Sequence, residues 1–357
     1  MNLEAARTQI SWRRMDENRK YQRLARQEDL AASAASSDVE SSPVLTSGWH
    51  SAPCAYILLS THNGALYLQE QLDSLLAQTH ENWVLYWRDD GSSDATVAML
   101  AEFRGLVGVE RCIHVDEPAG RLWPAASFFA LLRAVLPAVG PTDVVAFTDQ
   151  DDVWLPEKLA RGMAALEDIE AAALYCARLK VVDAELRHLT ETAINPAKCG
   201  FPASLTQNIA TGCTIMLNRR AAVLVTESRP PAASLHDWWC YLTVTAAGGR
   251  VLVDDARVAL YRQHRHNFIG VQLSTSRRAL AAVRRGPGIF MEMFRQHLAA
   301  LIAQPELTTE ATREIVLELH DALQGRLPRR LRSLWLPGLR RQSWLQTLLF
   351  RFWFLIG

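Results

Sequence analysis

A regular alternation of short apolar runs with helix-like segments begins at Ala55, and it constrains the fold more than any other feature of the sequence. Residues 55–59 (AYILL) form a continuous apolar run, which is typical of a strand buried on both faces. Leucines then recur at helical spacing, at Leu68, Leu72, Leu75 and Leu76. Because strands separated by helices need crossover connections, the pattern predicts an α/β fold with a mostly parallel central sheet.

The same alternation continues for about a hundred residues. Strands are expected at 83–87, 109–115 and 144–148, and helices at 95–103, 125–136 and 156–166. Ligands of such sheets bind beyond the carboxyl ends of the strands, so the residues that follow each strand are the candidates for function. These residues are 60–63 (STHN), 89–94 (DDGSSD) and 149–152 (DQDD). The expected ligand edge of the sheet is therefore polar and strongly acidic.

Composition excludes several classes of protein. The 357 residues include 38 Lys and Arg against 38 Asp and Glu, so the basic surplus that a dedicated nucleic-acid binder needs is missing. Six cysteines are scattered without a CxxC pair, which favours free thiols in a reducing compartment. No apolar run is long enough to span a membrane, and residues 1–14 lack the apolar core of an export signal. We therefore expect a cytoplasmic protein.

The acidic edge itself indicates a bound cation. Two clusters of carboxylates in a partly desolvated cleft would repel each other by several kcal/mol. A divalent cation, Mg²⁺ or Mn²⁺, resolves this because it binds carboxylate oxygens and leaves positions open for phosphates. Asp149 and Asp151 stand directly after an apolar strand, at a spacing that lets both address one ion or its waters. Neither a G-x-G-x-x-G segment after the first strand nor a P-loop occurs, which argues against a dinucleotide fold and a P-loop NTPase.

Five segments, taken in order, resemble the family-2 glycosyltransferases, and most closely the rhamnosyltransferase-like branch of bacterial polysaccharide and lipopolysaccharide biosynthesis. They are 59–64 (LSTHNG), 88–94 (RDDGSSD), 148–154 (TDQDDVW), 234–239 (SLHDWW) and 261–270 (YRQHRHNFIG). The resemblance implies one nucleotide-sugar-transferase domain of the GT-A type and an inverting transfer. Residues 1–52, which the resemblance does not cover, are rich in charged residues and then in Ser and Ala, and we expect a polar, partly disordered extension there. The transferase domain is expected at 53–270, followed by a helical C-terminal region with a basic and aromatic tail (271–357).

The resemblance also assigns donor contacts. Ser60 and His62 would line the base and ribose of a nucleotide-diphosphate sugar, and Asp90 would accept a hydrogen bond from the base. Asp89 would contact the same moiety or stabilise the turn, and Asp149 would touch the ribose or metal-bound water. The sequence has Ser127 where many relatives have Asn before Phe, which bears on donor selection.

The metal and the base are assigned in the same way. Asp151 would bind the cation directly, and His264 would help to hold the cation or the pyrophosphate. Asp237 matches the position of the general base, and its apolar neighbours would raise its pKa toward neutrality. Lys158 and Arg262 are candidates for contact with the pyrophosphate, or else for surface salt bridges.

Gly212, Trp238 and Trp239 are candidates for the acceptor side. A glycine lets the backbone approach a ligand closely, and a tryptophan ring can stack on a sugar, although core packing is an equal alternative for one of the two rings. The acceptor would be a saccharide or a lipid-linked saccharide, here with rhamnose as the sugar transferred.

Simpler roles remain open for several of these residues. Asp90 and Asp94 could cap the following helix, Asp151 could belong to a solvated turn, and Asp237 could be the N-cap of a helix over 238–247. A catalytically silent nucleotide-sugar binder or scaffold is the alternative function. A nucleotidyltransferase is disfavoured because residues 60–64 form no Gly-rich, basic loop.

The C-terminal tail has a composition of its own. Residues 326–357 contain seven arginines, six Trp or Phe residues and no Asp or Glu. Arginine attracts anionic lipid headgroups, and Trp and Phe favour the membrane interface. The tail either binds the inner face of the membrane peripherally or packs on the transferase domain.

Overall fold

The computed structural model describes residues 52–265, 267 and 287–357. Internal contacts divide the chain into two units, Met1–His50 and Ser51–Gly357. The N-terminal extension predicted at 1–52 lies almost wholly outside the described residues, as do residues 266 and 268–270 of the last family-like segment.

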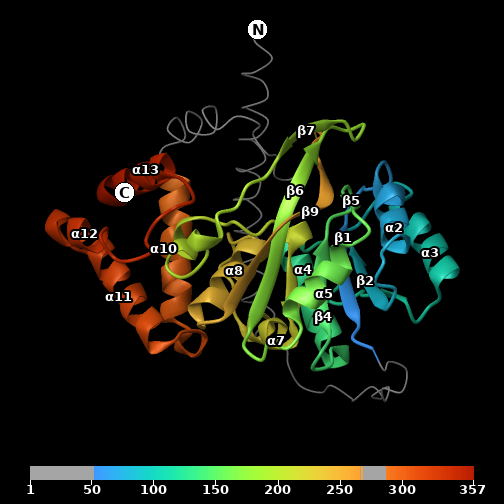
Figure 1. The fold of residues 1–357 in the computed structure, drawn as a ribbon, viewed down its shortest axis with the longest axis horizontal. Helices are drawn as coiled ribbons and strands as arrows, with labels where there is room; N and C mark the ends of the chain where they lie inside the picture. The colour runs from blue at the N-terminus through green and yellow to red at the C-terminus, as the bar shows by residue number, and fades with distance from the viewer. Residues whose placement is uncertain (1–51, 266, 268–286) are drawn as a thin grey trace, which may run out of the picture. The chain divides into compact units, whose positions relative to one another are not determined.

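The first half of the sheet is parallel, as the alternating pattern predicts (Figure 1). Strands pair in the order β3-β2-β1-β4, and each pairing is parallel. Their bounds are β1 Ala55–Thr61, β2 Trp83–Asp89, β3 Cys112–His114 and β4 Val144–Thr148. The crossovers contain α2 (Leu68–Leu76), α3 (Thr96–Val107) and α4 (Trp123–Val135). The carboxyl ends of β1, β2 and β4 therefore meet at one edge.

The second half of the sheet is mixed. β8 (Met216–Asn218) is antiparallel to β4 and to β6 (Ala173–Val182), and β9 (Arg250–Arg262) is parallel to β6. The short strands β5 (Val153–Trp154) and β7 (His188–Glu191) are antiparallel to β9 and β6. The nine described strands thus form one sheet. The crossover argument predicts the strands as far as β4, and the antiparallel pairings begin where β8 joins the sheet.

Both faces of the sheet are buried, as the apolar run in β1 predicts. Tyr56 and Leu58 join one apolar cluster with α4 and α8, whereas Ile57 and Leu59 join a second with α2. The remaining helices of this region are α5 (Lys158–Leu166), α6 (Ala203–Thr206), α7 (Arg219–Glu227) and α8 (His236–Ala246). Short 3-10 turns occur at Leu136–Ala138, Pro196–Lys198, Gly212–Thr214 and Pro305–Leu307.

The C-terminal region is helical, with α10 (Gly288–Ile302), α11 (Glu310–Gln324), α12 (Leu327–Ser333) and α13 (Trp344–Ile356). Phe294 of α10 and Phe350 of α13 belong to the same buried cluster as Trp239 of α8. Among the described residues, no helix is long and apolar enough to cross a membrane.

Candidate active site

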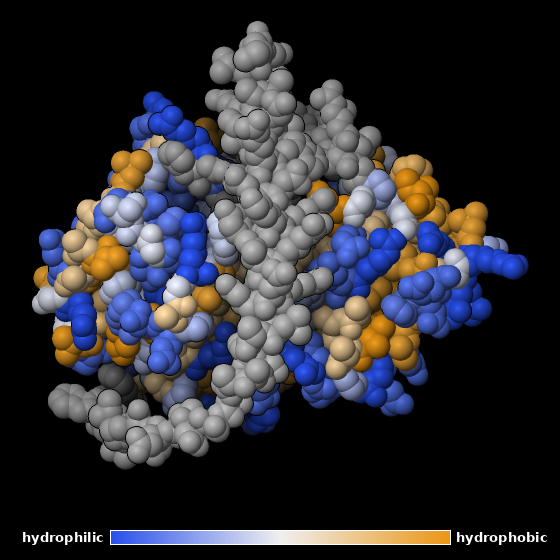
Figure 2. Space-filling view, turned by 180° about the vertical axis from the view of Figure 1, so that it is seen from behind, coloured by the Kyte–Doolittle hydropathy of each residue, from blue (hydrophilic) through white to orange (hydrophobic). Residues whose placement is uncertain are grey.

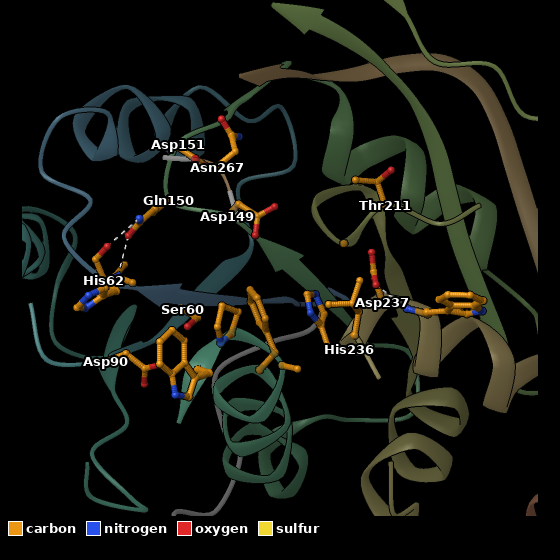
Figure 3. A pocket seen from close by; sticks show the side chains of 18 of the residues that line it. Ser60, His62, Asp90, Asp149, Gln150, Asp151, Thr211, His236, Asp237 and Asn267 are labelled. Atoms are coloured by element: carbon orange, nitrogen blue, oxygen red, sulfur yellow. Dashed lines mark hydrogen bonds between the residues drawn. The ribbon is translucent and has the colours of Figure 1, made fainter. Parts of the chain in front are cut away.

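A cavity of about 530 Å³ opens at the carboxyl edge of the sheet (Figure 3). The ends of β1 and β4, the start of α4, the turn at Gly212–Thr214 and the start of α8 line it. The cavity brings together eight residues that the sequence singles out: Ser60, His62, Asp90, Asp149, Asp151, Gly212, Asp237 and Trp238. Residues as far apart in the chain as Ser60 and Trp238 therefore converge on one site.

At one end of the cavity, a buried arginine neutralises Asp90. The Arg88 guanidinium forms an ion pair with Asp90 Oδ1 and donates to the carbonyl oxygens of Pro118 and Gly120. The Leu122 amide donates to the same Asp90 oxygen at 3.2 Å. Asp90 does not cap α3; instead Asp94 accepts from the Thr96 amide at 3.0 Å in the first turn of that helix. Asp90 is thus a fixed acceptor that faces the cavity.

Two other donor-side residues are held by partners that the sequence analysis did not assign. Ser60 Oγ donates to Ser127 Oγ at 2.8 Å, which places the departure at Ser127 directly beside a predicted donor contact. The Gln150 side chain accepts from the His62 amide at 2.9 Å and donates to the His62 carbonyl at 3.1 Å. A Cβ at Gly64 would lie 2.3 Å from Gln150 Oε1, so a glycine is needed at position 64 for Gln150 to make these two hydrogen bonds.

Asp149 and Asp151 lie in the middle of the cavity, with Asp237 beyond them (Figure 3). Burial, followed by repulsion from Asp151 and Asp237, raises the pKa of Asp149 to about 7. His264 Nε2 lies 2.8 Å from Asp151 Oδ2, and the His264 ring packs against Tyr67 with centroids 4.7 Å apart. The two predicted cation ligands are therefore neighbours.

The carboxylates of this site suit a divalent cation. His264 Nε2 and Asp151 Oδ2 are hydrogen-bonded to each other in this structure, and both atoms are of kinds that can bind a metal ion. The excess of carboxylates around Asp149 supplies the negative charge that a cation would offset. Asp149, Asp152 and Cys213 also have ligand atoms within 4.8 Å of one another. However, burial raises the pKa of the Cys213 thiol well above its usual value, so it remains a protonated partner of Asp152.

Asp237 stands in the first turn of α8 rather than at its N-cap, which is Leu235. Its carboxylate accepts from the Trp238 amide at 2.6 Å and also from the Asn208 side chain and the Gly212 backbone. Burial nevertheless raises the pKa of Asp237 to about 6, because these hydrogen bonds offset only part of the desolvation. The carboxylate is ionised at neutral pH but close to its titration point, as a general base requires.

His236 is a cavity residue whose surroundings the sequence could not reveal. Its ring lies 4.1 Å from that of Phe128 and 5.3 Å from that of Phe147, between centroids. Burial lowers the pKa of His236 to about 3, so the imidazole is neutral. Within the described residues, its Nε2 has no hydrogen-bond partner. A Cβ at Gly212 would lie 2.7 Å from this nitrogen, so Gly212 is needed for its packing as well as for access to the cavity.

Four predicted contacts are placed away from the cavity or in structural roles. Lys158 is fully buried, with its ammonium 3.3 Å from the centroid of the Trp154 ring, and burial lowers its pKa to about 7. Arg262 is buried between Glu70 and the carbonyl oxygens of Asp151 and Ala184. The prediction that Lys158 and Arg262 contact pyrophosphate is therefore corrected, because both side chains are buried and bound to other residues. Among described residues, Arg121 is the basic side chain that lines the cavity.

Asp89 and Trp239 are the other two predicted contacts that have structural roles. Asp89 accepts from the Gly91 and Ser92 amides at 3.0 and 2.6 Å, which supports the turn-stabilising alternative for this residue. Trp239 is fully buried and donates to Ser228 Oγ at 2.7 Å, so it belongs to the core. Trp238 alone of the two tryptophans lines the cavity.

Comparisons with known proteins agree with this geometry. Residues 56–222 match the model of Glycosyl transferase family 2. The dTDP-rhamnosyl transferase RfbG of Shigella flexneri is 22% identical over 226 residues, which is 60% of this chain and 75% of that protein. The putative teichuronic acid biosynthesis glycosyltransferase TuaG of Bacillus subtilis is 27% identical over 109 residues, 30% of this chain and 40% of that protein. The crystal structure of S. aureus TarS in complex with UDP-GlcNAc superposes with a TM-score of 0.52 at 16% identity and covers 78% of each chain.

The fold is thus of the GT-A type, with a mixed, partly parallel sheet and a helical C-terminal region. The chain carries a family-2 glycosyltransferase domain, and the protein is a glycosyltransferase. The resemblance drawn from the five sequence segments is confirmed.

Proposed function

We propose that the protein is an inverting, metal-dependent glycosyltransferase that moves a sugar from a nucleotide-diphosphate donor to a saccharide acceptor. The observation that carries the proposal is the contrast within one cavity: Asp90 is neutralised by Arg88, whereas Asp149 and Asp237 form no ion pair with a lysine or arginine among the described residues. The neutralised end suits an uncharged base and ribose, and the acidic end suits a cation and a proton transfer.

In the proposed reaction, Asp237 takes the proton from an acceptor hydroxyl. The hydroxyl oxygen attacks the anomeric carbon from the side opposite the nucleotide, and the bond from that carbon to the phosphate oxygen breaks. The nucleoside diphosphate leaves with the bonding electron pair, so the configuration inverts. Asp237 is suited to this step because its pKa of about 6 leaves it ionised yet basic at neutral pH.

Asp151 and His264 are the proposed cation ligands, with Asp149 beside them on the ribose or on metal-bound water. A divalent cation held there would supply compensation for the charge on the departing diphosphate. Ser60, His62 and Asp90 would hold the nucleoside, and Gly212 and Trp238 would face the acceptor. No structural observation favours the scaffold alternative.

The sugar is proposed to be rhamnose, and the acceptor a saccharide or lipid-linked saccharide of polysaccharide biosynthesis. The support is the sequence similarity to a protein named as a dTDP-rhamnosyl transferase and to one named for teichuronic acid biosynthesis. A lipid-linked acceptor would place the protein in the cytoplasm, peripherally at the inner face of the membrane.

A donor panel tests these proposals. Thymidine-, uridine- and guanosine-diphosphate sugars are compared for thermal stabilisation of the protein, with and without Mn²⁺ or Mg²⁺, because a ligand that binds only the folded state raises its melting temperature. We expect the largest shift with dTDP-rhamnose plus cation, and slow donor hydrolysis without acceptor. Stabilisation by every donor alike, or equal stabilisation in EDTA, would contradict the donor and the metal assignments respectively.

A further inference from the structure

Exposed apolar side chains gather at the C-terminal helices. Of fifteen large hydrophobic residues that are exposed in the described parts of the chain, eight lie between positions 327 and 356. They are Leu327, Leu331, Trp335, Trp344, Leu345, Leu348, Phe352 and Ile356, and they include every aromatic side chain in that exposed set. A cluster of this kind marks an interaction surface, whereas single exposed apolar residues do not.

The eight residues follow the periodicity of the helices. In and just beyond α12, Leu327, Leu331 and Trp335 recur at every fourth position. In α13, Leu345, Leu348, Phe352 and Ile356 recur at spacings of three and four. Residues so spaced share one helix face, so each helix presents a single apolar stripe to solvent.

Helices α12 and α13 are held beside each other. The Arg351 guanidinium of α13 lies 5.1 Å from the centroid of the Trp335 ring. Arg330 of α12 donates to the Leu355 carbonyl at 3.1 Å and to the Leu323 carbonyl at 2.8 Å, which ties α12, α13 and the end of α11 together. We call the eight exposed residues the α12–α13 face. Figure 2 shows this end of the molecule at its right-hand edge, where orange and blue surface alternate.

Helix α13 is packed on the rest of the protein through the side that lies away from the α12–α13 face. The opposite side of α13 is already packed, with Phe350, Trp353 and Phe354 buried. Their rings lie 5.5 to 6.0 Å, between centroids, from Phe290 or Phe294 of α10. Packing on the rest of the protein therefore accounts for one side of α13 and leaves the other side exposed.

The charge of the same segment indicates an anionic partner. Residues 326–357 contain seven arginines and no acidic residue, and Arg326, Arg329, Arg332 and Arg340 are exposed. Asp321 of α11 pairs with Arg329 at 2.8 Å, and Glu318 accepts from Ser333, so α11 offsets only part of this charge. A second copy of the chain would bring arginine against arginine across a two-fold axis, which disfavours self-association.

We propose that the α12–α13 face binds the surface of an anionic lipid bilayer, with the apolar stripes in the headgroup–acyl boundary and the arginines at lipid phosphates. Interfacial helices combine an apolar face with basic flanks in this way, and Trp and Phe settle at that depth. The proposal concerns a surface apart from the sugar-transfer cavity, and it does not depend on which sugar is moved.

The test is co-sedimentation of the full chain with vesicles of phosphatidylcholine alone or mixed with phosphatidylglycerol, at low and high salt. The apolar variant is Leu348→Ser with Phe352→Ser, and its matched control is Leu106→Ser, an exposed leucine of α3. The charge variant is Arg326→Gln with Arg332→Gln, and its control is Arg133→Gln, an exposed arginine of α4. All the substituted side chains are exposed or lie on an exposed stripe, so melting temperatures should match the parent.

We expect the parent to bind the anionic vesicles at low salt and to be released by high salt. Each arginine removed should lower binding about fivefold, since one basic residue near the surface contributes about that factor. The apolar variant should lose at least about tenfold at both salt concentrations, because it removes buried hydrocarbon. Both control variants should bind as the parent does.

Three results would overturn the proposal: no vesicle binding by the parent at low salt, equal losses in Leu106→Ser and in the apolar variant, or a parent dimer in solution that the apolar variant abolishes. Donor-induced thermal stabilisation is measured on every variant. It should be unchanged, so a failure of lipid binding is distinguishable from a failure of the proposed transferase function.

Discussion

The two ends of the cavity hold the same chemical group in opposite electrostatic settings. At the nucleoside end, Asp90 is buried against Arg88, which is itself anchored to two backbone carbonyl oxygens. At the other end, Asp149 and Asp237 have raised pKa values, about 7 and about 6, because burial is not offset by a paired cation. One carboxylate is thus part of the fold, and the other two are held in a state that costs folding free energy.

The electrostatic setting of each carboxylate decides whether it can take part in chemistry. A carboxylate locked in a buried ion pair keeps its charge and its position, which suits recognition of a neutral hydrogen-bond donor. A carboxylate whose pKa is raised toward 7 can exchange a proton near neutral pH, and without a paired cation it can attract a metal ion.

The largest expected effect is at the acidic end. Asp151→Ala should lower transfer by at least about 1,000-fold, since cation compensation is worth several kcal/mol in the transition state. The Asp151 side chain is only partly buried, so the fold should survive. Turnover and cation-dependent donor stabilisation are measured against Asp116→Ala, an exposed carboxylate outside the cavity. If Asp151→Ala turned over in EDTA as fast as the parent does with its cation, the metal assignment would be wrong.

Removing the partner at the nucleoside end should affect stability first. Arg88→Met leaves Asp90 buried and unpaired, which typically costs about 3–5 kcal/mol. Urea unfolding of the ligand-free protein measures this loss, with Arg133→Met as the control on an exposed arginine. A loss below about 1 kcal/mol, the range of surface pairs, would mean that the Arg88–Asp90 pair is hydrated and not a fixed part of the fold.

Asp237→Asn should act in the opposite direction on stability while reducing catalysis. Turnover should fall at least about 100-fold, the lower range for loss of a general base, with donor binding retained. The folded-state pKa of about 6 exceeds the ordinary value of 3.8, so this carboxyl contributes stability below about pH 4 and loses it as the pH rises past 6. At pH 7 the neutral amide should therefore stabilise the ligand-free protein by about 1–3 kcal/mol.

Turnover and urea unfolding are measured together on Asp237→Asn. Near-normal turnover would remove the base assignment. Destabilisation at pH 7 would instead mean that the Asp237 carboxylate stabilises the folded protein, as the paired Asp90 does.

Sequence reasoning predicted the parallel half of the fold because local patterns determine it. The apolar run of β1 and the leucine spacing of α2 are visible without tertiary information, and both elements form as expected. The antiparallel β8 is three residues long, and its place between β4 and β6 depends on contacts between distant segments. No periodicity in so short a segment could have placed it.

The site was predicted in part for the same reason. Acidic residues directly after strands were correctly brought together, because parallel strands share their carboxyl edge. Lys158 and Arg262 were misplaced, since a charge type says nothing about burial, and both have partners that are distant in sequence or aromatic. Gln150 and His236 take their places through close packing with Gly64 and Gly212, and the sequence pointed to Gly212 only for access by a ligand.

The smallest expected effect separates the two neighbours Asp237 and His236. Burial lowers the pKa of His236 to about 3, so its imidazole stays neutral throughout the range in which Asp237 titrates. Turnover should therefore decline between about pH 7 and pH 6 as Asp149 and Asp237 are protonated, and this decline should persist in His236→Gln. The amide can still hydrogen-bond in the cavity but loses the ring contact with Phe128, so turnover should change by less than about tenfold. If the decline disappeared or moved by about a full pH unit in His236→Gln, the titrating group would be the imidazole. The low pKa of His236, and with it the neutral state of the ring, would then be contradicted.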